Sequence, residues 1–187
     1  MDADKQTMIL DAAFDAFIRH GFRRVTMGEI ARAAGMSRPA LYLEFANKED
    51  IFTAVLRRYS DDLLSEIQAG LKARNTPADQ LMFVCDIWVV RPFEMVQQAP
   101  DAQELTDAGH AFASGLIAQV HQRLERIVAE IVTNAGSPSA SAMPSAASIA
   151  HVMVTAIHGF KDHAQDLADL KRLCADLVSL IAGPGSR

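Results

Sequence analysis

The chain has 187 residues, of which 50% are hydrophobic and 22% are charged, so it can bury a core and is not a disordered polypeptide. Its length fits one ordinary domain or two small ones and excludes a large multidomain assembly. The 18 basic and 23 acidic side chains give a formal net charge of −5, which taken alone argues against a nucleic-acid partner.

The charge is unevenly distributed along the chain. From Arg19 to Arg58 there are eight basic and four acidic side chains, a local net charge of +4, whereas the remainder is acidic. Screening limits the reach of each charge to about 8–10 Å, so the two parts act separately. A basic part that contacts phosphates is therefore compatible with an acidic chain.

Cysteine usage and hydropathy bear on the compartment. Cys85 and Cys174 lie in apolar runs far apart in the sequence, so we expect buried thiols and neither a disulfide framework nor a zinc site. The first residues, MDADKQTM, lack the basic-then-apolar order of a secretory signal. The longest apolar stretch, 81–96, contains charged residues and is shorter than the roughly 20 residues of a membrane span. We expect a cytoplasmic protein with no membrane partner.

The apolar spacing is helical from the start of the chain. Leu10, Phe14 and Phe17 recur at i, i+4 and i+7, which predicts a helix that ends near Gly21. Strand periodicity occurs nowhere in the sequence. The expected fold class is therefore all-α.

Two short helices follow. Thr26 and Glu29 fit a capping box, so a helix is predicted to begin at Thr26 and to end at Gly35, which adopts a left-handed conformation without steric cost. Ser37 can then cap the next helix, with Pro39 in its first turn.

Longer helices separated by prolines are predicted for the remainder. One is capped by Asn47 and continues towards Leu71, and another begins at Pro77. Breaks are expected at Arg91-Pro92 and at Pro100. A long helix over 112–131, an exposed loop over 134–148 and two further helices complete the chain.

The arrangement of short helix, glycine turn and second short helix over 26–45 indicates a helix-turn-helix. In this motif the first helix braces against the DNA backbone and the second enters the major groove. The expected core that sets the angle between the two helices consists of Ile30, Ala31, Ala34, Leu41 and Phe45.

Residues Ile9 to Leu56 resemble the DNA-binding domain of the TetR family of bacterial transcriptional regulators. The resemblance covers an AAxxxF helix, a GF pair, a Thr-x-x-x-Ile-Ala helix, Ala-Gly-x-Ser, Leu-Tyr-x-x-Phe and Lys-Glu. These motifs stand at Ala12–Phe17, Gly21-Phe22, Thr26–Ala31, Ala34–Ser37, Leu41–Phe45 and Lys48-Glu49.

The resemblance implies roles for individual residues. Those at the family's phosphate-contacting positions are Thr26, Tyr42 and Lys48, and those where bases are read are Ser37, Arg38, Pro39 and Ala40. Arg38 is the candidate for a bidentate guanine contact, whereas Pro39 and Ala40 can at most touch a thymine methyl group.

Several of these assignments have alternatives. Tyr42 could be a core tyrosine, and Lys48 could be a solvated lysine at a helix start. The chain departs from the family pattern at Leu43 and Glu44, where an aromatic or basic residue and a histidine are common. Glu44 either accepts from a cytosine amine or turns away from the phosphates.

The resemblance divides the chain into a helix-turn-helix domain over 1–64 and an effector-binding and dimerisation domain over 65–187. The last two helices would form a four-helix bundle with a second subunit, through Ile149, Val152, Met153, Ala156, Ile157, Phe160, Leu170, Cys174, Leu177 and Ile181. Alternatively, these residues only close the core of one subunit. Dimerisation would place two DNA-reading heads about 34 Å apart on an inverted repeat.

A small-molecule effector, apolar or aromatic in nature, is expected in the middle of the second domain. The candidate pocket residues are Met82, Phe83, Cys85, Trp88, Phe93, Met95, Phe112, Leu116 and His121. The alternative is that these are core side chains, and His121 in particular could be a core histidine.

The expected function is that of a DNA-binding transcriptional regulator, an effector-released repressor that binds a palindromic double-stranded operator as a homodimer. We expect no enzymatic activity, cofactor or metal, because no nucleophile signature, phosphate loop or metal-ligand spacing occurs. The alternative is a helical small-molecule-binding protein with weak or lost DNA binding.

Overall fold

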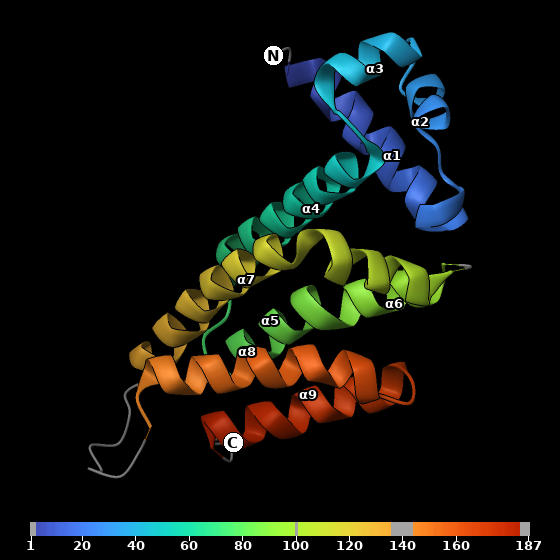
Figure 1. The fold of residues 1–187 in the computed structure, drawn as a ribbon. Helices are drawn as coiled ribbons and strands as arrows, with labels where there is room; N and C mark the ends of the chain where they lie inside the picture. The colour runs from blue at the N-terminus through green and yellow to red at the C-terminus, as the bar shows by residue number, and fades with distance from the viewer. Residues whose placement is uncertain (1–2, 100, 136–143, 184–187) are drawn as a thin grey trace. The chain divides into compact units, whose positions relative to one another are not determined.

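The computed structural model of the protein describes residues 3–99, 101–135 and 144–183 (Figure 1). Over these ranges every regular element is a helix and no strand occurs, which confirms the all-α prediction. The chain folds into two compact units, an N-terminal unit of Met1–Asp61 and Met95–Ile117 and a C-terminal unit of Asp62–Glu94 and Ala118–Arg187. The sequence did not indicate that residues 95–117 group with the N-terminal helices.

The N-terminal unit contains α1 (Ala3–Arg24), α2 (Met27–Ala33) and α3 (Arg38–Glu44), with parts of α4 (Lys48–Leu71), α6 (Arg91–Gln97) and α7 (Ala102–Asn134). The C-terminal unit contains the remainder of these three helices with α5 (Pro77–Cys85), the π-helical turn η1 (Asp86–Val90), α8 (Ala146–His163) and α9 (Leu167–Ala182).

The predicted helix boundaries in the helix-turn-helix are confirmed. Thr26 caps α2 in a complete capping box with Glu29, and Gly35 has a φ of 68° in the turn that follows. The Ser37 hydroxyl accepts a hydrogen bond from the Ala40 N–H at the start of α3. Asn47 likewise caps α4, because its Oδ1 accepts from the Asp50 N–H at 2.7 Å.

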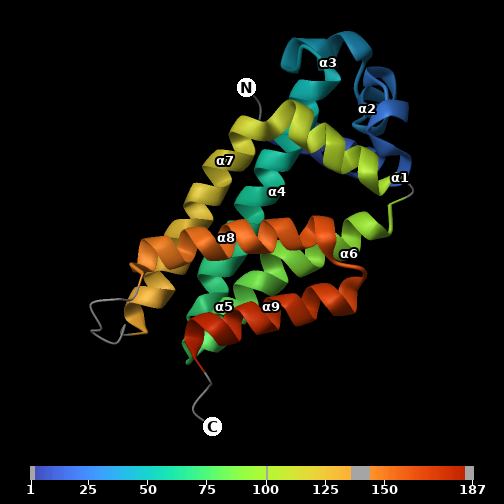
Figure 2. The same cartoon turned by 60° about the horizontal axis from the view of Figure 1, so that its bottom comes forward.

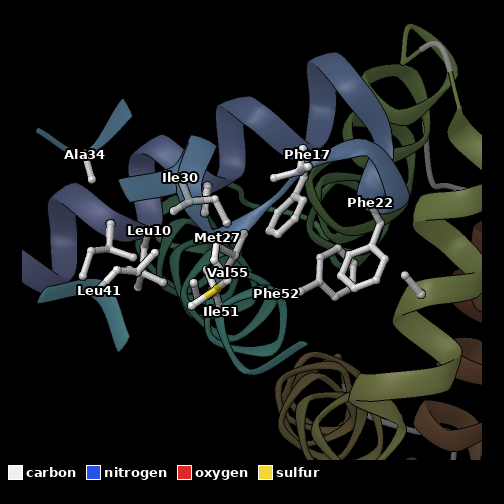
Figure 3. Close-up of a cluster of buried hydrophobic side chains, with 14 of the residues drawn as sticks. Leu10, Phe17, Phe22, Met27, Ile30, Ala34, Leu41, Ile51, Phe52 and Val55 are labelled. Carbon is white, nitrogen blue, oxygen red and sulfur yellow. The ribbon is translucent and has the colours of Figure 1, made fainter. Parts of the chain in front are cut away.

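The core of the N-terminal unit joins α1, α2, α3 and α4, as Figure 3 shows. Four of the five predicted helix-turn-helix core residues are buried: Ile30, Ala31, Ala34 and Leu41. Phe45 is half-buried at its edge. The largest fully buried side chains here are Ile9, Phe17, Ile30, Leu41 and Ile51, so removing any of them would leave a cavity.

Gly21 interrupts the helical backbone of α1, as the sequence predicted for that position. Its φ is 75° and its ψ is 166°, a combination that is open to glycine and costly for other residues. A Cβ at this position would lie 3.1 Å from Asp101 Cβ and 3.2 Å from Glu104 Oε2. Glu104 also accepts a hydrogen bond from the Arg23 N–H, so this turn is held from α7.

The expected break at Arg91-Pro92 is wrong, because the chain stays helical from Pro77 to Gln97. The turn before Pro92 widens instead into η1, in which the Arg91 N–H donates to the Asp86 carbonyl five residues earlier. The Pro92 ring would clash with the carbonyl four residues before it in a regular α-helix, and a π turn relieves that clash. Residues Ile87, Trp88, Val89 and Val90 of η1 are all buried.

In the C-terminal unit, α9 packs against α5, η1 and α8. Helices α8 and α9 lie side by side in both views (Figure 2). Pro100 and the central residues of the predicted 134–148 loop, 136–143, lie outside the described residues. Among the described helices, none combines the length and the apolar character that crossing a membrane requires.

Candidate nucleic-acid interface

Helix α3 buries one side and exposes the other. Leu41 is fully buried against the core, whereas Arg38, Pro39, Tyr42 and Leu43 are exposed. Leu43 is 87% exposed and Tyr42 is 44% exposed, so Tyr42 is not a core tyrosine. The exposed surface of α3 is therefore made of a cation, a phenol and two apolar side chains, presented by a helix anchored through Leu41.

Arg38 and Tyr42 lie one turn apart and contact each other. Arg38 Nη2 donates to the Tyr42 hydroxyl at 3.3 Å, and the Arg38 Cζ lies 5.6 Å from the Tyr42 ring centroid. Among the described residues no carboxylate forms an ion pair with Arg38. Tyr42 thus orients the guanidinium and leaves most of its five N–H donors for another acceptor.

Thr26 and Ser37 use their hydroxyl groups within the chain. The Thr26 hydroxyl donates to Glu29 Oε2 at 2.9 Å and accepts from the Glu29 N–H at 3.3 Å. Hydrogen bonds from the Thr26 N–H and hydroxyl lower the pKa of Glu29, so the carboxylate form of the capping box is favoured. Both residues set helix starts, in addition to any role at the DNA.

The structure places Lys48 in a position that differs from both sequence interpretations. Its Nζ donates to the carbonyls of Phe22, Arg23 and Val25 at 2.7, 3.3 and 2.9 Å. The same atom lies 4.3 Å from the Phe22 ring centroid. All three ammonium hydrogens are used in this way, so Lys48 ties the end of α1 and the following Val25 to the start of α4.

Sequence reasoning missed Leu43 as a surface feature and noted it only as a departure from the family pattern. Leu43 follows Pro39 by four residues, so the two share one side of α3. The spacing of four residues between Pro39 and Leu43 could therefore have predicted that Leu43 is exposed. Ala40 is half-buried and Glu44 is half-buried, so neither is as accessible as Leu43.

The predicted dimer residues separate into two groups. Met153, Ile157, Leu170 and Cys174 are 0% exposed within one chain, so their assignment to an interface between chains is corrected to the core. The others remain half-buried or exposed: Ile149, Val152, Ala156, Phe160, Leu177 and Ile181. Leu180, which the sequence reasoning did not include, is 83% exposed on α9.

Cys85 and Cys174 are free and buried, as predicted. The interaction with the Cys174 thiol and the burial raise the pKa of Cys85, so its thiol stays protonated at neutral pH.

The predicted effector residues do not all belong to one unit. Met95, Phe112 and Leu116 belong to the N-terminal unit, where the Phe112 ring lies 5.3 Å from Phe22. The other six residues belong to the C-terminal unit: Met82, Phe83, Cys85, Trp88, Phe93 and His121. Of these, Cys85, Trp88 and Phe93 are buried core side chains. The Phe83 ring lies under the Arg74 guanidinium, with the Arg74 Cζ 3.2 Å from its centroid.

Residues 9–55 match the model of the bacterial regulatory proteins of the tetR family. The HTH-type transcriptional activator FasR of Mycolicibacterium smegmatis is 36% identical over 69 residues, 37% of this chain and 32% of that protein. The HTH-type transcriptional repressor ComR of Escherichia coli is 40% identical over 62 residues, 33% of this chain and 30% of that protein. The chain thus spans about a third of the length of these curated relatives.

Solved structures share the fold over nearly the whole chain. A transcriptional regulator from Cytophaga hutchinsonii matches with a TM-score of 0.79 at 20% identity, covering 95% of this chain and 96% of that one. The fatty acid degradation regulator FadR from Bacillus halodurans matches with a TM-score of 0.66 at 19% identity, covering 100% of both chains. Residues 9–55 thus match the model of the tetR family, and the fold of the chain is shared with these solved regulators over nearly its whole length.

Proposed function

We propose that this protein is a transcriptional regulator, not an enzyme, that binds double-stranded DNA by placing α3 in the major groove. The single observation that carries the proposal is the exposed surface of α3, where Arg38 lies next to Tyr42 with no carboxylate paired to it among the described residues. A guanidinium oriented in this way is suited to the O6 and N7 atoms of guanine. Pro39 and Leu43 add an apolar strip suited to thymine methyl groups.

We further propose that the protein acts in the cytoplasm as a homodimer on a palindromic operator. The support is apolar surface on α8 and α9, where Val152 is 58% exposed and Leu180 is 83% exposed. Val152 and Ala156 follow Ile149 by three and seven residues and therefore share one side of α8. A second copy of the same surface would cover these side chains in a two-fold arrangement.

Release by a small-molecule effector is the third part of the proposal. Helix α4 runs without interruption from Lys48 to Leu71, so it belongs partly to the unit that carries α3 and partly to the C-terminal unit. A ligand that favours one conformation of the C-terminal unit could act through this helix on the spacing of two DNA-reading heads. In that mode the protein is a repressor whose operator affinity falls when the effector binds.

The proposal is tested by selecting bound fragments from random DNA and measuring their affinity by fluorescence anisotropy at two salt concentrations. We expect an inverted repeat whose half-sites contain guanine, and an affinity that decreases with salt because phosphate contacts release counterions. Enrichment of no sequence, together with failure to retard any duplex, would rule out the DNA-binding function.

One observation favours the alternative, a helical small-molecule-binding protein with weak DNA binding. The ammonium of Lys48 is engaged by three carbonyls of its own chain, so one of the three expected phosphate contacts is weakened. The same selection distinguishes the two functions, because the alternative predicts only weak, sequence-independent binding.

A further inference from the structure

Three basic side chains meet between α7 and α8 in the C-terminal unit, and the DNA-binding function leaves them unexplained. The His121 and His158 rings are 4.8 Å apart, centroid to centroid, in an edge-to-face arrangement. Lys161 follows His158 by three residues and therefore lies on the same side of α8. His121 is close enough to both His158 and Lys161 to feel their charges.

The surroundings of this cluster are apolar. Leu124 lies one turn from His121 on α7, and Val154 and Ile157 lie one turn before His158 and Lys161 on α8. All three are buried. The three basic residues are themselves half-buried, so they lie at the margin of the apolar core.

Burial shifts the ionisation of the cluster. Loss of water, together with the charges of His158 and Lys161, lowers the pKa of His121 to about 4, whereas Glu125 opposes the shift. Loss of water also lowers the pKa of Lys161 to about 8, with Asp162 opposing. At neutral pH the cluster therefore contains a neutral His121 imidazole and a charged ammonium.

The acidic groups nearby do not neutralise that ammonium. Glu125 Oε1 lies 2.9 Å from the Nδ1 atom of His151, so this carboxylate is already engaged. Within the part of the chain that the structure describes, Lys161 forms no ion pair with a carboxylate. The loss of water that lowers the pKa of Lys161 disfavours its charged form, and an anion bound beside the ammonium would favour that form again.

We propose that His121, His158 and Lys161 bind the carboxylate head group of an amphiphilic ligand whose apolar remainder contacts the core of the C-terminal unit. A carboxylate accepts several hydrogen bonds, which the ammonium and the imidazole N–H groups can donate. Its single charge matches that of the Lys161 ammonium, whereas a phosphate dianion carries one negative charge more. This inference rests on the proposed function in that the carboxylate is the effector, and it adds a charged head group to the apolar or aromatic ligand expected from the sequence.

Binding should be linked to protons in a defined direction. A bound carboxylate favours charged Lys161 and so raises its pKa above the value of about 8 in the free protein. The free protein loses this proton as the pH rises through 8, so affinity is highest below pH 8 and falls above it. Between pH 7 and about pH 9.5 the affinity should fall by up to about thirtyfold.

The experiment is calorimetric titration of the full chain with butanoate, octanoate and dodecanoate, each compared with the alcohol of equal length. We expect at least one carboxylate to bind at least about tenfold more tightly than its alcohol, because charge-assisted hydrogen bonds are lost in the alcohol. Repeating the titration in buffers of different ionisation enthalpy should reveal proton uptake. Octyl phosphate is the third arm, and it should bind more weakly than octanoate.

Lys161→Met should abolish the preference for the carboxylate, and Lys171→Met, an exposed lysine on α9, should leave it unchanged. Because Lys161 is half-buried and methionine provides an apolar side chain of similar length, the Lys161→Met protein should fold. An independent measurement on the unaltered protein is the NMR titration of His121, whose pKa should rise from about 4 when the carboxylate binds.

Equal binding of carboxylates and alcohols, no binding by any carboxylate, or tighter binding of octyl phosphate would each overturn the head-group assignment. DNA affinity is measured separately without ligand, so the two proposals can fail independently. A protein that binds an operator but no carboxylate keeps its proposed function and loses this site. A protein that prefers carboxylates but retards no DNA keeps the site and loses the function.

Discussion

At the scale of single residues, two basic side chains predicted to contact DNA have different surroundings. Arg38 is exposed and contacts the hydroxyl and the ring of Tyr42. Lys48 is half-buried and donates to three carbonyls of its own chain. Each hydrogen bond to a charged group contributes about 1.5–3 kcal/mol, so moving Lys48 onto a phosphate would cost more than an exposed phosphate contact returns.

Arg38→Ala should reduce discrimination at one base pair in each half-site. The loss should be about 1–3 kcal/mol for the preferred base and near zero for the others, because a bidentate contact is read at one position. Anisotropy titrations with operators altered at single positions, at fixed salt, measure this. Arg126→Ala, an exposed arginine of the C-terminal unit, is the matched control. An equal loss on operator and random DNA would show that Arg38 contacts phosphate instead.

Lys48→Met should lower stability more than DNA affinity. It removes three hydrogen bonds at the junction of α1 and α4, so we expect a loss of about 2 kcal/mol or more in the free energy of unfolding by urea. The slope of log affinity against log salt should stay the same, whereas loss of a phosphate contact would reduce it by about one. Lys72→Met, an exposed lysine after α4, serves as the control. An unchanged unfolding free energy with a reduced salt slope would contradict this role.

At the scale of elements, glycine and proline alter two helices by different physical means. Gly21 admits a backbone conformation that no other residue adopts cheaply, and α1 changes direction there. Pro92 removes a donor and crowds the preceding turn, and the helix responds by widening to η1 and continuing. Both positions could be identified as special from the sequence. Whether the helix would break or widen at Pro92 was decided by tertiary packing. Four residues of η1 are buried, and the helix widens there and continues.

Gly21→Ala should destabilise the N-terminal unit by about 1–3 kcal/mol, since alanine is strained at a φ of 75° and its methyl group would crowd Asp101 and Glu104. Thermal and urea unfolding measure the change. Gly115→Ala is the matched control in the same unit, because a Cβ there meets no atom within 4 Å. This second change should be neutral or stabilise by up to about 1 kcal/mol. Equal effects of the two substitutions would show that the Gly21 conformation carries no strain.

At the scale of the whole molecule, the apolar side chains that α8 and α9 leave exposed are more informative than those they bury. Met153, Ile157, Leu170 and Cys174 close the core of one chain and need no partner. Val152 and Leu180 have no such role in the single chain, because most of their surface is exposed. Covering apolar surface yields about 25 cal/mol per Å², so a second copy could gain stability from these residues.

Replacing both Val152 and Leu180 by lysine should therefore convert a dimer to a monomer. Sedimentation equilibrium at micromolar concentration should show the mass halved, because two charges per chain would be buried at the interface. The helical content should not change, since both side chains are exposed in one chain. Met8→Lys, which alters an exposed apolar residue of α1, should leave the mass unchanged. A monomeric unaltered protein, or an unaffected mass in the double variant, would contradict the proposed interface.

The sequence by itself determined the features that depend on residues within about four positions of each other. The caps at Thr26, Ser37 and Asn47 and the turn at Gly35 form through short-range hydrogen bonds and backbone sterics, so their residue types suffice to place them. The exposure of Leu43 follows from its spacing to buried Leu41 and exposed Pro39. Nearly all of the helix-turn-helix could be predicted on this basis.

Only the tertiary structure decided which side chains from distant segments meet. Lys48 donates hydrogen bonds to carbonyls that lie more than 20 residues earlier in the sequence. Cys85 and Cys174 interact although they are far apart in the sequence. His121, His158 and Lys161 form a cluster of basic side chains that composition did not reveal. Helical periodicity indicates that one face of a helix is apolar, but it does not indicate which other helix packs against that face. That choice is made by packing, where burial changes the ionisation and the hydrogen bonds of each group.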